Sequence, residues 1–155
     1  KVHLAYVGDG NNVCHSLLIG AALTGMTMTV VTPTGFEPST SVWQKVQQLA
    51  VASGAKLNLS TQLSDASGAD AIYTDTWLSM GDKADPAVIE QTFRPYQINS
   101  GVMRQLAVKN FMHCLPAHRE HEVTSEVLDS DNSLVLQQAE NRMHAQNAVL
   151  VSLFS

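Results

Sequence analysis

Short apolar segments rich in β-branched residues alternate with longer segments of helical character along most of this chain, and Gly or Pro turns separate them. This alternation is the strongest constraint on the fold, because strands that are joined by helices pair in parallel and need cover on both faces of their sheet. We expect strands at 2–7, 28–31, 56–59, 71–74, 110–115 and 133–136, and helices at about 13–23, 42–52 and from 138 onward. The sequence therefore predicts an α/β fold, a Rossmann-like three-layer sandwich with a mostly parallel sheet.

Composition narrows the classes of partner. The chain has 155 residues, 45% of them hydrophobic, which is enough for one ordinary globular core. A formal net charge of -5 with nine scattered Lys and Arg residues argues against nucleic acid as a partner. No apolar run is long enough to span a bilayer and no signal-peptide layout begins the chain, so we expect a cytoplasmic protein without a membrane partner. Cys14 and Cys114 are far apart and are expected to stay reduced.

The first candidate ligand loop is GDGNN, which follows the first predicted strand, since open parallel sheets bind ligands beyond the carboxyl ends of their strands. Gly8-Asp9-Gly10 matches the first half of the dinucleotide motif G-x-G-x-x-G, but Val13 stands at the position of the third glycine. No acidic residue near 30–33 is available to hold a ribose. A nicotinamide cofactor is therefore a weak alternative, and a glycine turn in which Asn11 or Asn12 caps the next helix explains the same residues equally well.

The second candidate loop is TDTWLSMG, residues 74–81, which places Asp75 directly at a strand end. A carboxylate there suits an ammonium group, while Ser79 and the backbone around Met80 could bind the rest of a small polar ligand. An ordinary Asx turn with Trp77 packed on the core is the alternative, and the loop alone favours it.

The third candidate loop begins with His113 and Cys114 at the end of a predicted buried strand. Neighbouring residues on a strand point to opposite faces, so His113 is badly placed to deprotonate Cys114 and cysteine-protease chemistry is disfavoured.

A zinc site is a further hypothesis for this loop, because His118, His121 and Glu122 follow His113 and Cys114 closely. The spacing argues against it: an H-E-x-x-H motif needs Glu directly after the first His, and Arg119 stands there. We prefer a solvated loop for His118 and His121, and we expect no metal.

The last predicted helix opens with QAENR, in which Arg142 could offer a bidentate guanidinium to a phosphate or carboxylate. An exposed ion pair on the helix surface is the simpler interpretation of this residue alone.

Taken together, GDGNN, D-x-x-x-S-M-G, HCLP and AENR occur in this order at the ends of successive predicted elements, and the set resembles the ornithine carbamoyltransferases of the aspartate/ornithine carbamoyltransferase family over essentially the whole chain. That family has two domains. The resemblance implies that residues 1–137 form the ornithine-binding domain and that 138–155 form a helix that packs on the carbamoyl-phosphate domain. The S-T-R-T phosphate motif of that other domain has no counterpart here, because Ser39-Thr40-Ser41-Val42 does not replace it, so the isolated chain is expected to be inactive.

The resemblance also implies roles for individual residues. Asn12, Asp75, Ser79 and Met80 would hold ornithine. Cys114, Leu115 and Arg142 would lie on the carbamoyl-phosphate side, with Cys114 and Asp75 as the catalytic residues.

The implied reaction is attack of the neutral δ-amine of ornithine on carbamoyl phosphate, giving citrulline and phosphate without a covalent enzyme intermediate or a cofactor. Within the family, HCLP argues against aspartate as the acceptor, and Ser79-Met80-Gly81 argues against putrescine, which has no α-carboxylate. The implied partners are L-ornithine, carbamoyl phosphate with the other domain, and sister subunits of a homotrimer or a multiple of trimers. A nucleotide-binding Rossmann module, a zinc hydrolase or zinc-stabilised interaction domain, and a carbamoyltransferase with another amine acceptor remain the alternatives.

Overall fold

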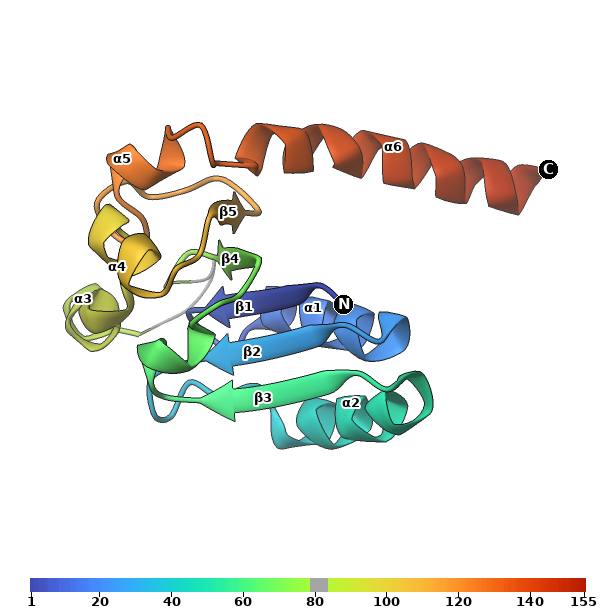
Figure 1. Ribbon diagram of the computed structural model, residues 1–155, viewed down its shortest axis with the longest axis horizontal. Coiled ribbons are helices and arrows are strands. Elements are labelled where there is room, and N and C mark those ends of the chain that lie inside the picture. Colours follow the sequence, from blue (N-terminus) through green and yellow to red (C-terminus); the bar gives the residue numbers. More distant parts are fainter. Residues whose placement is uncertain (79–83) are drawn as a thin grey trace.

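The computed structural model describes residues 1–78 and 84–155, and within them a parallel sheet is surrounded by helices (Figure 1). The strands are β1 (His3–Val7), β2 (Thr27–Val31), β3 (Lys56–Ser60), β4 (Ala71–Thr74) and β5 (Asn110–His113). The α-helices are α1 (Asn12–Thr24), α2 (Thr40–Ser53), α3 (Pro86–Phe93), α4 (Ser100–Gln105), α5 (Ser125–Leu128) and α6 (Val135–Phe154). Two 3-10 turns, η1 (Leu63–Ala66) and η2 (Arg94–Tyr96), complete the chain.

The sheet has the strand order β3-β2-β1-β4-β5, and all four strand pairs are parallel. The chain builds outward from β1 to β3, and then returns to the other side of β1 with β4 and β5. The carboxyl ends of β1 and β4 therefore lie side by side at the point where the strand order reverses. The predicted α/β class and mostly parallel sheet are confirmed.

Two hydrophobic layers cover the two faces of the sheet. Helices α1 and α2 bury Leu18 and Val46 against Tyr6 and Val30 on one face. On the other face, η1, α4, α5 and the connecting segments pack around Phe111. A third, smaller cluster of Trp77, Ile89 and Phe93 lies next to the carboxyl edge, with the rings of Trp77 and Phe93 stacked at 5.9 Å. The three-layer arrangement follows from strands that are apolar on both sides.

The first two helices end where their sequences supply caps. The side chains of Asn11 and Ser39 accept backbone N–H bonds at the starts of α1 and α2, and Gly25 and Gly54 end these helices in the left-handed conformation. The predicted bounds of 13–23 and 42–52 lie within two residues of the observed ones.

The predicted sixth strand at 133–136 is wrong. Ser133 makes a single parallel bridge to Phe111, with the N–H of Leu134 donating to the Phe111 carbonyl at 2.8 Å, and α6 then begins at Val135. The helix-forming residues from Gln137 onward therefore extend back over part of the apolar segment and leave one bridge of the expected strand. The predicted strand at 110–115 also ends early, at His113, because Leu115 has a φ of 58° and cannot continue a strand.

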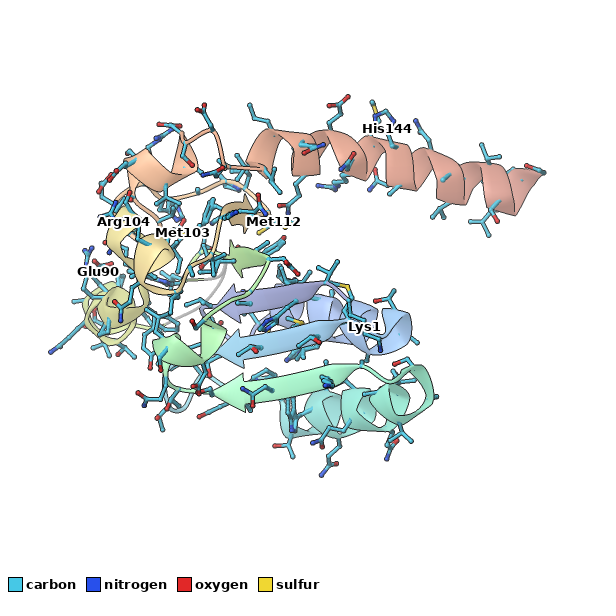
Figure 2. All side chains as sticks on the ribbon, in the orientation of Figure 1. Lys1, Glu90, Met103, Arg104, Met112 and His144 are labelled. Carbon is cyan, nitrogen blue, oxygen red and sulfur yellow. The ribbon has the colours of Figure 1, made fainter. Side chains whose placement is uncertain are left out.

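Helix α6 leaves the body of the molecule and extends away from the sheet, as Figure 1 shows. Val135 is its buried anchor, and every residue from 139 to 154 is exposed, including Val149, Leu150 and Phe154. Figure 2 shows His144 on this projecting part, with side chains standing free of the body around it. Within the described ranges, no helix is both long and apolar enough to cross a membrane.

Candidate ligand site at the carboxyl edge of the sheet

Three loops meet at one edge of the sheet, because β1 neighbours β4 and β4 neighbours β5. They are the GDGNN turn after β1, the segment that starts with Asp75 after β4, and the segment that starts with Cys114 after β5. The sequence predicted each loop, and the strand order places them next to one another.

The GDGNN turn needs its second glycine for space. A Cβ on Gly10 would lie 2.3 Å from the backbone nitrogen of Pro38, and the Gly10 N–H donates to the Phe36 carbonyl at 2.8 Å. Gly8, with a φ of 149°, makes the turn out of β1. The glycines therefore fit the loop against residues 36–38, which accounts for them without a dinucleotide.

Asn11 joins the first loop to the second. Its Oδ1 accepts from the N–H groups of Val13 and Cys14 at 2.9 and 3.1 Å, while its Nδ2 donates to Asp75 Oδ2 at 2.9 Å. One side chain thus caps α1 and holds the carboxylate of the second loop.

Asp75 is the centre of the site. The residue is 8% exposed and accepts three hydrogen bonds: Asn11 on Oδ2, and Thr76 N–H at 2.8 Å and the Cys114 thiol at 2.9 Å on Oδ1. A carboxylate with these donors and some remaining exposure is suited to receive a cation from solvent.

Cys114 is exposed on one side and donates its thiol hydrogen to Asp75 on the other. Partial burial and this hydrogen bond raise the pKa of Cys114 to about 12, whereas a hydrogen bond with Tyr73 acts in the opposite direction. The thiol is therefore neutral near pH 7, which makes it a hydrogen-bonding group and a poor nucleophile.

His113 fixes the backbone on which Cys114 lies. Its Nδ1 accepts from the Leu115 N–H at 2.8 Å, so the proton of a neutral ring is on Nε2, which lies 3.2 Å from Glu122 Oε1 outside linear hydrogen-bond geometry. Both side chains are about 1% exposed, and Glu122 also accepts from the His118 N–H at 2.5 Å. The buried side chains of His113 and Glu122 thus accept backbone hydrogen bonds from Leu115 and His118, within and just after the HCLP segment.

Asp75, His113 and Cys114 form a group of potential metal ligands among the described residues, with donor atoms within 4.8 Å of one another. The set does not fit a metal well, because both His113 nitrogens already face Leu115 and Glu122. His118 and His121 have side chains that are 62% and 58% exposed, as expected for a solvated loop.

The remaining predicted residues lie at different distances from this centre. Asn12 is exposed at the start of α1, and Leu115 is partly buried directly after Cys114. Arg142 is exposed on the projecting part of α6. Ser79 and Met80 lie outside the described residues.

The sequence did not reveal four contributors to the site. They are Tyr73, Glu122, Gln138 and, in its role as the hydrogen-bond partner of Asp75, Asn11. Asn11 was recognised only as a possible cap. Gln138 Nε2 donates to the Tyr73 hydroxyl at 2.9 Å across 65 residues of sequence, so no local pattern could reveal the pair. The signal for Glu122 was an acid in an otherwise solvated loop, and its burial appears only in three dimensions.

The fold and the site define an α/β domain with a small polar site at the switch point of its sheet. The Asp75 carboxylate makes this site suited to a positively charged ligand group. A family model described as aspartate/ornithine carbamoyltransferase, Asp/Orn binding domain, matches residues 1–153. The ornithine carbamoyltransferase of Shewanella oneidensis is 56% identical over 154 residues, which are 99% of this chain and 51% of that protein. That of Moritella abyssi is 49% identical over 153 residues, again 99% of this chain and 51% of that protein.

Solved structures agree with the sequence matches. The ornithine carbamoyltransferase of Pyrococcus furiosus superposes with a TM-score of 0.90 and 47% identity over 97% of this chain and 49% of that chain. The chain therefore belongs to the aspartate/ornithine carbamoyltransferase family and corresponds to its Asp/Orn-binding domain. It spans about half the length of the curated relatives that it matches.

Proposed function

We propose that this chain is the ornithine-binding half of a two-domain carbamoyltransferase, which transfers the carbamoyl group of carbamoyl phosphate to the δ-amine of L-ornithine and releases citrulline and phosphate. The observation that carries the proposal is the Asp75–Cys114 pair at the meeting point of three loops, in a chain 56% identical to an ornithine carbamoyltransferase. We further propose that the two-domain enzyme acts in the cytoplasm, as a homotrimer or a multiple of trimers.

The reaction needs an acidic side chain that attracts an ammonium group. It also needs a neighbouring side chain that does not compete with the δ-amine as the nucleophile. Asp75 supplies the negative charge for ornithine, with Asn12, Ser79 and Met80 as further ornithine contacts. Cys114 and Leu115 lie beside the δ-nitrogen and the carbamoyl group, and Arg142 faces the phosphate side once the other domain is present.

The neutral δ-amine attacks the carbonyl carbon of carbamoyl phosphate, and the tetrahedral intermediate collapses with loss of phosphate. The amine proton leaves during this step, and the Asp75–Cys114 pair is the local acceptor system. A thiol with a pKa near 12 supports hydrogen bonding to the reacting nitrogen rather than attack on carbon. Positioning and electrostatics then account for most of the rate.

Citrulline formation tests the proposal. The two-domain enzyme, with this chain as its second half, is assayed with carbamoyl phosphate and ornithine, N-acetylornithine, putrescine or aspartate. Ornithine should give the highest kcat/KM, and a preference for another acceptor would refute the assignment. The 155-residue chain alone should give no citrulline, because the phosphate-binding residues of the proposed first domain are not among its own.

A further inference from the structure

The start of α1 holds the side chain of Asn11 in one orientation. Its Oδ1 accepts the N–H groups of Val13 and Cys14 at 2.9 and 3.1 Å, and its backbone is extended, as is usual for an N-cap. The opposite orientation of the amide would turn its hydrogens toward those two donors and its oxygen toward the Asp75 carboxylate. The Nδ2 group is therefore committed to Asp75, whose Oδ2 accepts from it at 2.9 Å.

The donors around Asp75 are divided unequally between its two oxygens. Oδ1 accepts the Thr76 N–H at 2.8 Å and the Cys114 thiol at 2.9 Å. Oδ2 accepts from Asn11, and from no other side chain or backbone group of the described residues. A carboxylate oxygen has about two acceptor positions, so Oδ2 is the oxygen that keeps one for a ligand. Donors on both oxygens also oppose rotation of the carboxylate about its Cβ–Cγ bond.

Asn11 reaches Asp75 from a well-packed part of the fold. Helix α1 has 13 residues and buries Cys14 and Leu18 against the sheet. Asp75 follows β4, which is the neighbour of β1 in the sheet. Because the cap fixes Nδ2 relative to the helix, the orientation of the carboxylate is set by α1 as well as by its own loop.

We propose that Asn11 is a positioning residue for the carbamoyl transfer: by holding Asp75 Oδ2 from the start of α1, it aims the remaining acceptor position of that oxygen at the ammonium group of the amino-acid substrate. This role rests on the proposed function, because only a substrate with an ammonium group uses it. Asn11 acts through Asp75 and needs no contact of its own with the substrate. Without the amide donor the carboxylate can turn, which weakens substrate binding more than it slows the chemical step.

Steady-state kinetics of the two-domain enzyme, with this chain as its second half, test the proposal. Asn11→Ser keeps the N-cap of α1, because the serine oxygen accepts the same N–H groups, but its shorter side chain offers no amide to Asp75. We expect the KM for ornithine to rise about tenfold, as for loss of a hydrogen bond to a charged group. The kcat and the KM for carbamoyl phosphate should stay within about twofold of the parent values.

The matched control removes an N-cap of the same residue type away from the site. Asn99 Oδ1 accepts the Val102 N–H at 3.0 Å at the start of α4. Asn99→Ala should lose stability through its missing cap and leave the KM for ornithine unchanged. A change in KM that follows from loss of stability alone would therefore appear in this variant as well.

A double-mutant cycle shows whether Asn11 acts through Asp75. In the Asp75→Asn enzyme, the addition of Asn11→Ser should change the KM for ornithine by less than about twofold, because the carboxylate that Asn11 aims is already gone. A merely structural role of Asn11 would raise the KM by the same factor in both backgrounds.

Solvent exchange of side-chain amide hydrogens, followed by NMR in the isotopically labelled 155-residue chain, tests the contact without any substrate. Asp75→Ala removes the acceptor and should speed exchange of the Asn11 Nδ2 hydrogens about fivefold. Asn12 is exposed and serves as the internal reference, because exchange of its side-chain amide should not change.

An ornithine KM of Asn11→Ser within about twofold of the parent value would overturn the proposal. So would an equal rise in both backgrounds of the double-mutant cycle, or unchanged exchange of the Asn11 amide in Asp75→Ala. A parent two-domain enzyme that forms no citrulline would instead refute the proposed function, and the exchange measurement would still decide whether Asn11 holds Asp75.

Discussion

Replacing Glu122 with alanine should destabilise the domain strongly, because this buried carboxylate accepts the backbone N–H of His118 and lies against the buried ring of His113. Oε1 accepts the His118 N–H at 2.5 Å and lies 3.2 Å from His113 Nε2, and Glu122 itself is 1% exposed. A buried donor that loses its acceptor costs about 1–3 kcal/mol, and removal of one member of a buried pair costs about 3–5 kcal/mol in total. We therefore expect Glu122→Ala to lose about 3 kcal/mol of unfolding free energy.

Urea unfolding of the 155-residue chain, followed by circular dichroism, measures this loss. With a slope of about 1–3 kcal/mol/M, the midpoint should fall by about 1–3 M. Glu122→Gln is the matched variant, because its amide oxygen can replace Oε1 as the acceptor of the His118 N–H, and it should lose about 1 kcal/mol or less. Glu126→Ala removes an exposed acid nearby and should stay within about 0.5 kcal/mol. Equal losses for Glu122→Ala and Glu122→Gln, or a loss below about 1 kcal/mol for alanine, would refute the reasoning.

Four further outcomes are expected. Asn11→Ala should lower the unfolding free energy by about 1 kcal/mol, because α1 loses its N-cap, whereas Asn11→Ser should keep most of the stability of the parent chain. Equal losses for the two variants in urea unfolding would exclude the capping role. Asp75→Asn in the two-domain enzyme should weaken ornithine binding by about 2 kcal/mol or more in calorimetry and leave carbamoyl-phosphate binding nearly intact, and an unchanged ornithine affinity would count against the assignment. Cys114→Ser should reduce turnover, and mass spectrometry of enzyme quenched during turnover should find no carbamoylated Cys114, since an adduct there would overturn the mechanism. The isolated chain should self-associate through the apolar side chains of α6 in sedimentation measurements, and Leu150→Gln with Phe154→Gln should reduce this association.

Local pattern was sufficient for most strands of the sheet and for its first two helices. The segments 28–31 and 71–74 are short, apolar and bounded by turns, and both form strands with bounds at or near those predicted. The segment 133–136 is also short and apolar but lies directly before strong helix formers, and it forms one bridge followed by a helix. A four-residue apolar run does not carry enough information to decide between the two states, so its neighbours decide.

The site was predictable only in part, because its defining contacts are not local. Asp75 and Cys114 were each recognisable at a strand end, and the resemblance to carbamoyltransferases placed both at the reacting centre. Their hydrogen bond joins residues 39 positions apart, and it exists because β4 and β5 are neighbours in the sheet. That Asn12 contacts ornithine stays a prediction, and the hydrogen bond to Asp75 comes from its neighbour Asn11. Adjacent asparagines at a helix start differ in role only through the direction of their side chains, which the sequence does not encode locally.

The boundary between a binding domain that ends at 137 and a terminal helix from 138 remains a prediction. The contacts of Gln138 mark the point where α6 leaves the body of the domain. Helix α6 begins at Val135, which is buried in the body, and its next turn places Gln138 against the hydroxyl of Tyr73. Every residue from 139 onward is exposed. The first turn of the helix is therefore part of the site, whereas the rest is a surface that needs another partner. A displacement of the start of α6 would therefore move Gln138 relative to the Tyr73 hydroxyl at the strand end that precedes Asp75.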